Sequence, residues 1–546
     1  MRYFVYHCSI LSINIGETFR RIIGKAVSWV LKSDIQEAAG PLQVCTGLKS
    51  GAEAAVHYMR EQFQLETTEA VILVDASNAF NSVNRAALLH NIQIICPEFS
   101  TIAINMYRTD CRLFVSGTEI ASSEGTTQGD NLAMSLFAMA TLPVLRWLQQ
   151  HTAVHQVWLA DDATGAGDLK SLPKWWLDIV SEGEKYGYYV NAAKSCLVLK
   201  SSDLLREASH LFGETGITLK TDGQRHLEAV LGGEEFQVSY IKHLVEEWGS
   251  MLKNLVEYAK SQPHAAYASF TQGVRHKFTY FMRTMEISNY LAPLDELLTR
   301  DFIPTLFGGP ISPIERESIA LPVKYGGLGI PILTELAKKE YCTSLIVTQH
   351  TVTAMKFQSD HQITDVEEKL KFELKLVLEK RIAEYTEHQS DILKQLSNKA
   401  KRTVEQNMEA GSSNWLSCLP IRKYGFCLNK AEFRDCLRLR YRKELANLPS
   451  KCHCGAKFEM NHALNCPQGG LIIIRHNEVR DFLASVINKV QNDVEVEPKL
   501  QPIDGERFLT RSTLTGEQAH PDIRARGFSR AGHWSACLLR CQGHKP

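Results

Sequence analysis

The stretch AVILVDASNAFNSV, residues 70–83, predicts an apolar strand that ends at Asp75 and turns helical after it. A second stretch, VHQVWLADDATGAG at residues 154–167, predicts a β-hairpin with Asp161 and Asp162 at its turn. Carboxylates in such apolar contexts are costly unless a cation or a partner charge compensates them. Three carboxylates that converge at strand ends could hold two Mg²⁺ ions about 3.5–4 Å apart. The alternative is that all three acids are ordinary turn residues.

Two further segments extend this pattern. SSEGTTQGDNLAM, residues 122–134, predicts a glycine-containing loop that leads into a helix over residues 128–150. GYYVNAAKSCLVLK, residues 187–200, predicts a strand with Lys194 at its mouth. Both segments therefore add chemistry-bearing side chains at the ends of predicted elements.

The rest of the chain is mainly helix-periodic. Two helices are expected over residues 17–63, and a strand is expected near residues 226–231. From Ser239 onward the helical period is almost continuous, with breaks at proline and glycine. The expected fold class is α+β, with a mixed module near residues 65–235 followed by helical modules.

The order and spacing of the four segments resemble the palm of a reverse transcriptase, specifically that of non-LTR (LINE-type) retrotransposons. In that family an A-F-D-S-V-N run, a Q-G-D-P loop and an F/Y-A-D-D turn recur in this order. The resemblance implies an RNA-directed DNA polymerase, which uses Mg²⁺ or Mn²⁺ to add dNTPs to a primer 3′-OH on an RNA template. It also implies a right-hand polymerase fold with these parts: partial fingers over 1–65, palm over 66–235, thumb-like helices over 236–335 and a helical linker over 336–450.

The resemblance implies roles for individual polar residues. Asp75 and Asp161 would ligate the metal ions, with Asp162 beside them, and the carbonyl of Ala76 could complete the coordination. Lys194 matches a lysine near the triphosphate, able to neutralise charge or to protonate the leaving pyrophosphate. A solvated strand-end charge is the plain alternative for this lysine.

Other residues match the nucleotide and primer contacts of the family. Phe80 matches the steric gate, whose ring occupies the space of a ribose 2′-OH, and Gln128 and Gly129 match the loop that packs on nucleotide and template. RHLEAVLGG, residues 225–233, resembles the hairpin that grips the primer. The alternatives are a helix core residue at Phe80 and a capping residue at Gln128.

The chain departs from the family pattern at three positions. Leu159 replaces the aromatic residue before Ala-Asp-Asp, Asn131 replaces the proline after Gln-Gly-Asp, and Leu11 replaces an arginine that contacts the incoming nucleotide. The triphosphate contacts are therefore incomplete. Three nearby cations could contribute phosphate contacts or could simply be solvated: Arg20, Arg21 and Lys25.

Two segments combine cations with aromatic or apolar residues. Residues 264–284 hold the position of a thumb, so their cations are candidates for contact with the nucleic-acid backbone, while their aromatics fit a helix core better. The candidate cations are Arg275, His276, Lys277 and Arg283. Residues 421–460 hold ten Lys/Arg and four Asp/Glu, which also favours nucleic-acid contact.

The spacing C-x-C-x7-H-x3-C in CHCGAKFEMNHALNC predicts a zinc knuckle over residues 451–470. Three thiolates and one imidazole would close a tetrahedral Zn²⁺ site that is structural and not catalytic. The ligands would be Cys452, Cys454, His462 and Cys466, with His453 as a possible substitute for one thiolate. Incidental cysteines are the alternative.

Residues 471–546 resemble a truncated restriction-enzyme-like endonuclease, of the kind that follows such a knuckle in some retrotransposons. Asp522, in AHPDIRARGF, matches the first carboxylate of that nuclease. The 24 residues after it contain no Asp or Glu, whereas a second acid and a lysine are required. We expect no working nuclease, and the last residues resemble an early stop after a frame shift.

Composition sets broad limits. The 546 residues carry 61 Lys+Arg against 61 Asp+Glu and are 44% hydrophobic, which excludes collagen-like, low-complexity, disordered and disulfide-dense classes. Most of the 14 cysteines show no close pairing, as is typical of reduced intracellular thiols. No run reaches the about 18 apolar residues of a membrane span, and no signal peptide is recognisable. We expect a fragment of a longer polyprotein that has lost both ends.

Two hypotheses of different classes remain. The first is the reverse transcriptase, which the family's use of a nicked chromosomal 3′-OH would place in the nucleus with an RNA template and a DNA primer or target as partners. The second is a decayed or domesticated nucleic-acid-binding protein without polymerase turnover. An RNA-dependent RNA polymerase is disfavoured, because the ring of Phe80 would exclude the 2′-OH.

Overall fold

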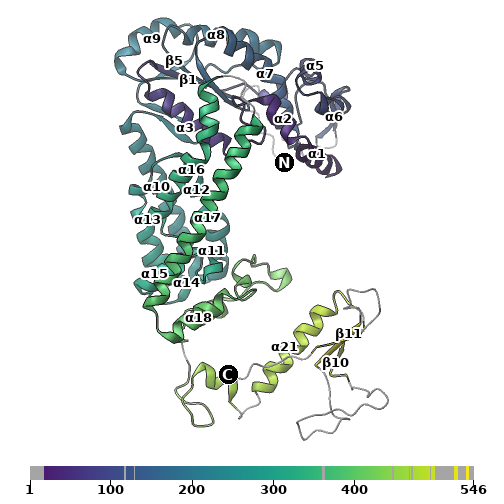
Figure 1. Ribbon diagram of the computed structural model, residues 1–546, viewed down its shortest axis with the longest axis vertical. Coiled ribbons are helices and arrows are strands. Elements are labelled where there is room, and N and C mark those ends of the chain that lie inside the picture. The colour runs from purple at the N-terminus through teal and green to yellow at the C-terminus, as the bar shows by residue number, and fades with distance from the viewer. Residues whose placement is uncertain are drawn as a thin grey trace. The chain divides into compact units, whose positions relative to one another are not determined.

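The computed structural model divides the chain into two compact units, Met1–Lys443 and Glu444–Pro546, and each is described by itself. It describes residues 18–115, 118–127, 129–358, 363–445, 448–466, 468, 471–491, 493–498, 522–526 and 536–539. Figure 1 shows the elements along the chain.

The first unit contains a five-stranded sheet in the order β4-β5-β1-β6-β7. All neighbours are antiparallel except the parallel pair β6–β7. The strands are β1 (Ala70–Val74), β4 (His155–Leu159), β5 (Asp162–Gly167), β6 (Cys196–Leu199) and β7 (Thr218–Lys220). The strand expected at 70–74 and the hairpin expected at 154–167 are thus confirmed.

Helices pack around this sheet and enclose one apolar core, whose largest fully buried side chains include Trp158 and Trp175. Between Thr18 and β1 the structure has three helices, and not the two expected, because the chain breaks at Leu31 as well as before Gly51. The helices are α1 (Thr18–Val30), α2 (Lys32–Ala39), α3 (Gly51–Gln64), α4 (Ala79–Ser82), α5 (Arg85–Ile95), α6 (Pro97–Tyr107), α7 (Ala133–His151), α8 (Leu172–Lys185) and α9 (Leu205–Phe212).

Two separate hairpins accompany the sheet. The first joins β2 (Cys111–Val115) to β3 (Thr118–Ser122). The second joins β8 (Gly223–His226) to β9 (Ala229–Gly232). The strand expected near residues 226–231 is confirmed in part by β9, whereas Leu227 and Glu228 form the turn before it.

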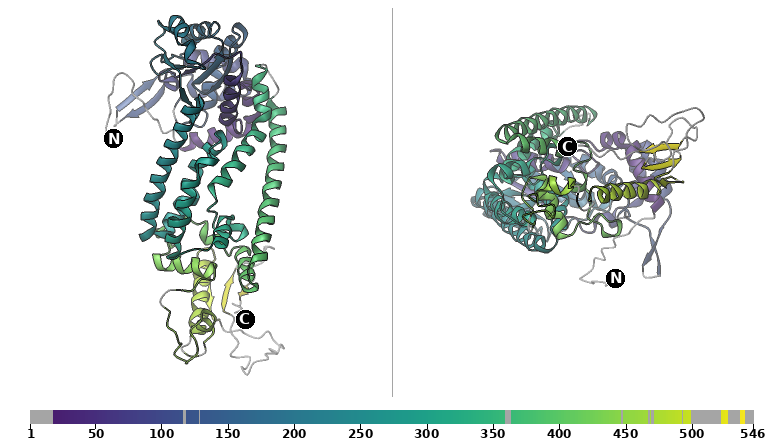
Figure 2. Two further views of the ribbon diagram at one scale, coloured as in Figure 1. Left: turned by 90° about the vertical axis from the view of Figure 1, so that its left-hand side faces the viewer. Right: turned by 90° about the horizontal axis from the view of Figure 1, so that it is seen from below.

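Beyond β9 the first unit is helical and has a second apolar core around Trp248. Figure 2 shows its long helices running lengthwise from the sheet. The helices are α10 (Glu234–Ser261), α11 (Pro263–Ser269), α12 (Arg275–Thr284), α13 (Ala292–Leu297), α14 (Ile303–Phe307), α15 (Pro313–Ala320), α16 (Leu333–Lys356), α17 (Ile363–Gln395), α18 (Asn398–Met408) and α19 (Lys430–Arg440).

The second unit is small. It contains α20 (Met460–Asn465), α21 (Leu471–Ile487) and the sheet β10-β11-β12, formed by Glu495–Val496, Ile523–Arg526 and Ala536–Leu539. Among the described residues of both units, no helix is long and apolar enough to cross a membrane.

Candidate active site

The carboxylates of the sheet gather at one end because of strand register. Val74 pairs with Ala163, so Asp75 leaves β1 beside the start of β5, and Leu159 pairs with Asp162 across the tight turn of the β4–β5 hairpin. Asp75 and Asp161 are half-buried, and Asp162 is exposed. Two segments of sequence whose acids lie up to 87 positions apart therefore present them at the same end of the sheet.

The three acids act on one another electrostatically. Partial loss of water around Asp162, together with repulsion from Asp161 and Asp75, raises the pKa of Asp162 to about 6. Burial, with a smaller contribution from Asp75, also raises the pKa of Asp161. This end of the sheet thus carries negative charge that would be relieved by a cation.

The hairpin turn is held rigidly from both sides. Ala160 has a positive φ of 57° and is buried, and the amide of Gln43 forms hydrogen bonds to its carbonyl and from its N–H, at 3.2 and 2.9 Å. The hydroxyl of Tyr188 donates to the carbonyl of Asp161 at 2.8 Å. The acids therefore stand on a turn whose backbone has little freedom.

Asp75 is fixed by the segment that carries Lys194. The Asp75 N–H donates to the hydroxyl of Ser195 at 3.0 Å, and the Asp75 carbonyl accepts from the N–H of Asn191 at 2.7 Å. Ala76 forms a β-bridge with Val190, and Lys194 is exposed in the turn that follows. The structure thus brings Lys194 to the same end of the sheet as Asp75.

Phe80 is half-buried and stacks on Phe137 of α7, with ring centroids 4.5 Å apart. Its carbonyl accepts from the N–H of Thr126, at 2.6 Å, so the loop before α7 lies against it. Gly129 is exposed in that loop with φ of 83°. Gln128 lies outside the described residues.

The cations of α1 are less available than expected. Arg20 pairs with Asp130 at 2.7 Å, and the carboxylate side chain is completely buried. Arg21 and Lys25 remain exposed, and the carbonyl of Arg21 accepts from the amide of Asn131. Arg20 therefore anchors α1 to the loop at Gly129, whereas Leu11 lies outside the described residues.

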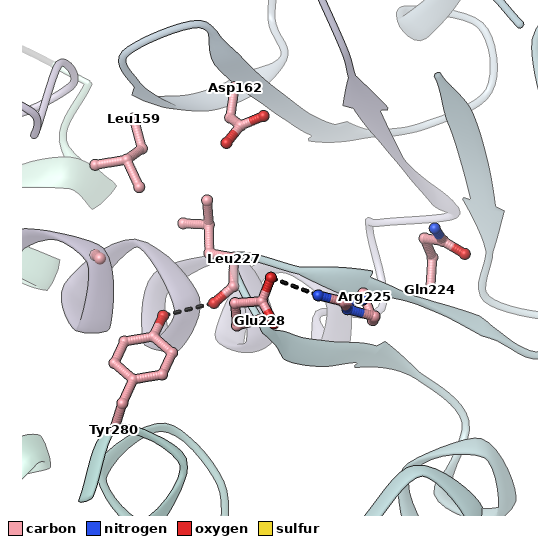
Figure 3. A pocket seen from close by; sticks show the side chains of 8 residues that line it. Leu159, Asp162, Gln224, Arg225, Leu227, Glu228 and Tyr280 are labelled. Atoms are coloured by element: carbon pink, nitrogen blue, oxygen red, sulfur yellow. Dashed lines mark hydrogen bonds and ion pairs between the residues drawn. The ribbon is translucent and has the colours of Figure 1, made fainter. Parts of the chain in front are cut away.

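A pocket of about 500 Å³ opens between Asp162 and the β8–β9 hairpin. Figure 3 shows Asp162 on one side and Leu227 and Glu228, at the hairpin turn, on the other. Its lining consists of Ala52, Leu159, Asp162, Gln224, Arg225, Leu227, Glu228 and Tyr280. The sequence did not predict Ala52, because no pattern around it indicates a pocket residue, and the aromatics around Tyr280 were expected in a helix core.

The cations of residues 264–284 are largely bonded within the protein. Arg275 donates to the carbonyl of Gly329, Lys277 pairs with Glu247, and Arg283 pairs with acids on other helices. His276 is exposed. The expected core role of the aromatics is confirmed for Phe270, Phe278 and Phe281, which are all buried.

The basic segment that ends the first unit is also partly structural. Arg434 donates to the carbonyl of Thr305, and Arg438 donates to the carbonyls of Phe307 and Gly308, which end α14. Lys443 pairs with Glu315 at 2.9 Å. Arg434 and Arg438 thus hold α19 against the end of α14, and Lys443 is neutralised by an acid of α15.

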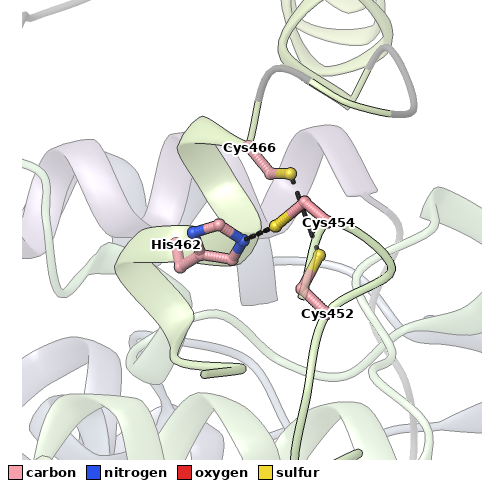
Figure 4. Close-up of side chains that lie close together, drawn as sticks. All are labelled: Cys452, Cys454, His462 and Cys466. Carbon is pink, nitrogen blue, oxygen red and sulfur yellow. Dashed lines mark hydrogen bonds between the residues drawn. The ribbon is translucent and has the colours of Figure 1, made fainter. Parts of the chain in front are cut away.

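The second unit brings together the four Cys/His residues of the predicted knuckle, Cys452, Cys454, His462 and Cys466 (Figure 4). Their candidate ligand atoms all lie within 4.8 Å of one another. The Sγ atoms of Cys452 and Cys466 are 3.8 Å apart, which is close to the edge of a tetrahedron with Zn–S bonds of about 2.3 Å. Hydrogen bonds from the N–H of Cys454 and from His462 lower the pKa of the Cys452 thiol to about 6.

Two other predicted positions behave differently. His453 is not part of the described metal-binding group. Asp522 precedes β11, and one of its carboxylate oxygens lies 3.1 Å from Nε2 of His476 on α21. Among the described residues, the Cys/His group is the compact one, while Asp75, Asp161 and Asp162 form a looser set.

Comparison with known protein families and sequences gives two matches. Residues 15–238 match the family described as reverse transcriptase (RNA-dependent DNA polymerase). Over 479 residues the chain is 23% identical to the retrotransposable element SLACS 132 kDa protein of Trypanosoma brucei gambiense, covering 85% of this chain but only 36% of that protein.

Solved structures of telomerase are remotely similar. That of apo telomerase from Candida tropicalis matches with a TM-score of 0.31 and 11% identity, over 68% of this chain and 61% of that one. That of Candida albicans telomerase with a telomeric RNA fragment matches with a TM-score of 0.27 and 13% identity, over 53% and 54%. Both TM-scores are too low to establish a shared fold.

Proposed function

We propose that this chain, a non-LTR retrotransposon reverse transcriptase over residues 15–238, copies RNA into DNA at the end of its five-stranded sheet. The observation that carries the proposal is the convergence of Asp75, Asp161 and Asp162 inside the matched region, where Asp75 helps to raise the pKa of Asp161 and both help to raise that of Asp162. Mutually repelling carboxylates at strand ends favour divalent cations.

The donor set fits Mg²⁺ or Mn²⁺. Mg²⁺ is usually held by one or two carboxylates together with water and substrate phosphates, so a looser group of aspartates suits it. Asp75 and Asp161 would hold the ions, with Asp162 and the carbonyl of Ala76 beside them. When bound, the ions would activate the primer 3′-OH and neutralise the triphosphate.

Other residues would handle the substrate without a metal. The ring of Phe80, braced by Phe137, would exclude a ribose 2′-OH and so select dNTPs. Gly129 and Gln128 would pack on the nucleotide and template, and the exposed Lys194 would protonate the leaving pyrophosphate. The chain would bind an RNA template and a DNA primer.

The finer architecture belongs to the same proposal. We assign partial fingers to residues 1–65, the palm to 66–235, the thumb-like helices to 236–335 and the linker to 336–450. Priming from a nicked chromosomal end would require action in the nucleus. Residues 471–546 would be a nuclease remnant that does not cut, with Asp522 as its surviving acid.

Primer extension on an RNA template, with dNTPs and Mg²⁺ or Mn²⁺, tests the polymerase. Asp161→Asn should abolish extension, whereas Asp203→Asn, which changes an exposed acid away from the site, should leave it intact. Extension that persists in Asp161→Asn, or is absent from the unaltered chain, would refute the proposal.

A second candidate is a nucleic-acid-binding protein without turnover. It is favoured by the pairing of Arg20 with the buried Asp130, which removes one cation that could have compensated for the arginine replaced by Leu11. Binding of a primer–template duplex without nucleotide addition would support this candidate.

The Cys/His group of the second unit would bind Zn²⁺ as a closed structural site. Cys454→Ser should lower the zinc content of the purified chain, measured by elemental analysis. Cys418→Ser, at an exposed cysteine outside the group, is the matched control. Full occupancy in Cys454→Ser would exclude that residue as a ligand.

A further inference from the structure

The turn of the β8–β9 hairpin has an unfavourable backbone for its sequence. Leu227 has φ of 48° and Glu228 has φ of 64°, so two consecutive side-chain-bearing residues occupy the left-handed region. Two-residue hairpin turns of this kind prefer asparagine and glycine. A strained turn persists only where surrounding contacts over-determine it.

Two tyrosines from the helical segment supply such contacts. The hydroxyl of Tyr280, on α12, donates to the carbonyl of Leu227 at 2.5 Å. The hydroxyl of Tyr240, on α10, donates to the carbonyl of Glu228 at 3.1 Å. Each strained residue is therefore held by one hydroxyl, and both tyrosines are half-buried beside the turn.

The base of the hairpin is held by different groups. The ring of His226 forms a hydrogen bond with the hydroxyl of Thr164 on β5, at 3.1 Å. Gly223 and Gly232 pair so closely that a Cβ on Gly232 would lie 2.4 Å from the Cα of Gly223. The base of the hairpin is thus fixed by its own strand pairing and by a bond to β5, whereas its turn is fixed by α10 and α12.

We propose that Tyr240 and Tyr280 are positioning residues for nucleotide addition: they fix the turn that faces Asp162 and so set where the terminal nucleotide of the primer lies. This inference rests on the proposed polymerase function. Leu227 and Glu228 line the pocket opposite Asp162, so a shift of the turn changes the pocket directly. Misplacement of a reacting group by about 1 Å can cost about 100-fold in rate.

Amide hydrogen exchange tests whether the hydroxyls of Tyr240 and Tyr280 hold the turn, which we call the tyrosine clamp, and it does not require activity. In the variant Tyr240→Phe/Tyr280→Phe, amides of residues 223–232 should exchange faster, by about fivefold for each lost hydrogen bond. Tyr267→Phe is the matched control, because the Tyr267 hydroxyl donates to the carbonyl of Leu328 at 2.9 Å, away from the hairpin. Unchanged exchange in the double variant would overturn the clamp.

Single-turnover primer extension tests the positioning. The double variant should add the first nucleotide at least about tenfold more slowly, with an unchanged apparent affinity for dNTP, because in this proposal the turn positions the primer and not the nucleotide. An equal slowing in Tyr267→Phe would mean that the slowing results from a general loss of stability, and would overturn the inference. If the unaltered chain extends no primer, the proposed function fails, and exchange alone decides the clamp.

A glycine at the turn shows whether the two hydroxyls act by holding a strained backbone or only by filling space beside it. Glu228→Gly removes the penalty of the left-handed φ, and the exposed ion pair with Arg225 that it also removes contributes little. In this background the two Tyr→Phe changes should slow addition less than they do alone. An equal loss in both backgrounds would mean that the hydroxyls do not act through the turn.

Discussion

Replacing Arg283 with methionine should destabilise the first unit strongly. Arg283, on α12, forms two bonds to Glu53 on α3, at 2.9 and 2.8 Å, and one to Glu340 on α16, at 3.0 Å. The side chains of all three are at most 15% exposed. This cluster joins a helix of the sheet module to two helices of the helical segment, so its loss affects both cores.

The loss of stability in Arg283→Met depends on the partners that Glu53 and Glu340 retain. Breaking a buried pair by removing one partner costs about 3–5 kcal/mol. Glu340 retains its ion pair with Arg381, at 2.9 Å, and Glu53 still accepts a hydrogen bond from the hydroxyl of Ser344, at 2.7 Å. Neither carboxylate therefore loses all its partners. The expected loss in the free energy of unfolding is therefore at the lower end, about 3 kcal/mol.

Urea unfolding followed by far-ultraviolet circular dichroism measures this loss. Arg300→Met is the matched control, because its pair with Glu296 is exposed and should contribute less than about 1 kcal/mol. Adding Glu53→Gln to Arg283→Met should restore about 1–2 kcal/mol, since a neutral amide costs less to leave unpaired than a carboxylate. A loss below about 1 kcal/mol in Arg283→Met, or a further fall with Glu53→Gln, would refute the reasoning.

Three other changes have defined outcomes. Phe80→Val should admit ribonucleotides in primer extension; unchanged selectivity would remove the gate assignment. Burial lowers the pKa of His57 and of His226 to about 4, so each stays neutral when folded and binds a proton more readily when unfolded. Acidification from pH 7.5 to pH 5 should therefore lower the free energy of unfolding by about 2 kcal/mol per histidine, seen as a lower urea midpoint; a constant midpoint would contradict this. Gly187→Ala should cost at least about 2 kcal/mol, because its Cβ would lie 2.0 Å from the carbonyl oxygen of Ser82; wild-type stability would count against that packing.

The parts of the site that sequence predicts are those encoded locally. An apolar strand followed by Asp75, and a hairpin with Asp161 and Asp162 at its turn, need only short-range patterns. The antiparallel pairing of β1 with β5 then brings the acids together. The contacts that then fix them, from Gln43 to Ala160 and from Ser195 to Asp75, are long-range and have no local signal.

Long-range partners explain what sequence could not predict. Arg283 and Glu53 are 230 positions apart, so a cation that resembles a nucleic-acid contact is in fact the centre of a largely buried cluster with two glutamates. Tyr280 and Leu227 are 53 positions apart, and nothing near either marks the hydrogen bond between them. Only the family resemblance of residues 225–233 indicated a hairpin there, because Leu227-Glu228 is an unfavourable sequence for its turn.

The β8–β9 hairpin is held by side chains that lie beyond the matched family region. The matched family region ends at residue 238, just before Tyr240 and well before Tyr280. A protein cut at that boundary would keep Asp75, Asp161 and Asp162 on an intact sheet. It would nevertheless lose the two tyrosine hydroxyls that hold the turn opposite them, so a fragment meant to keep this pocket must extend through α12.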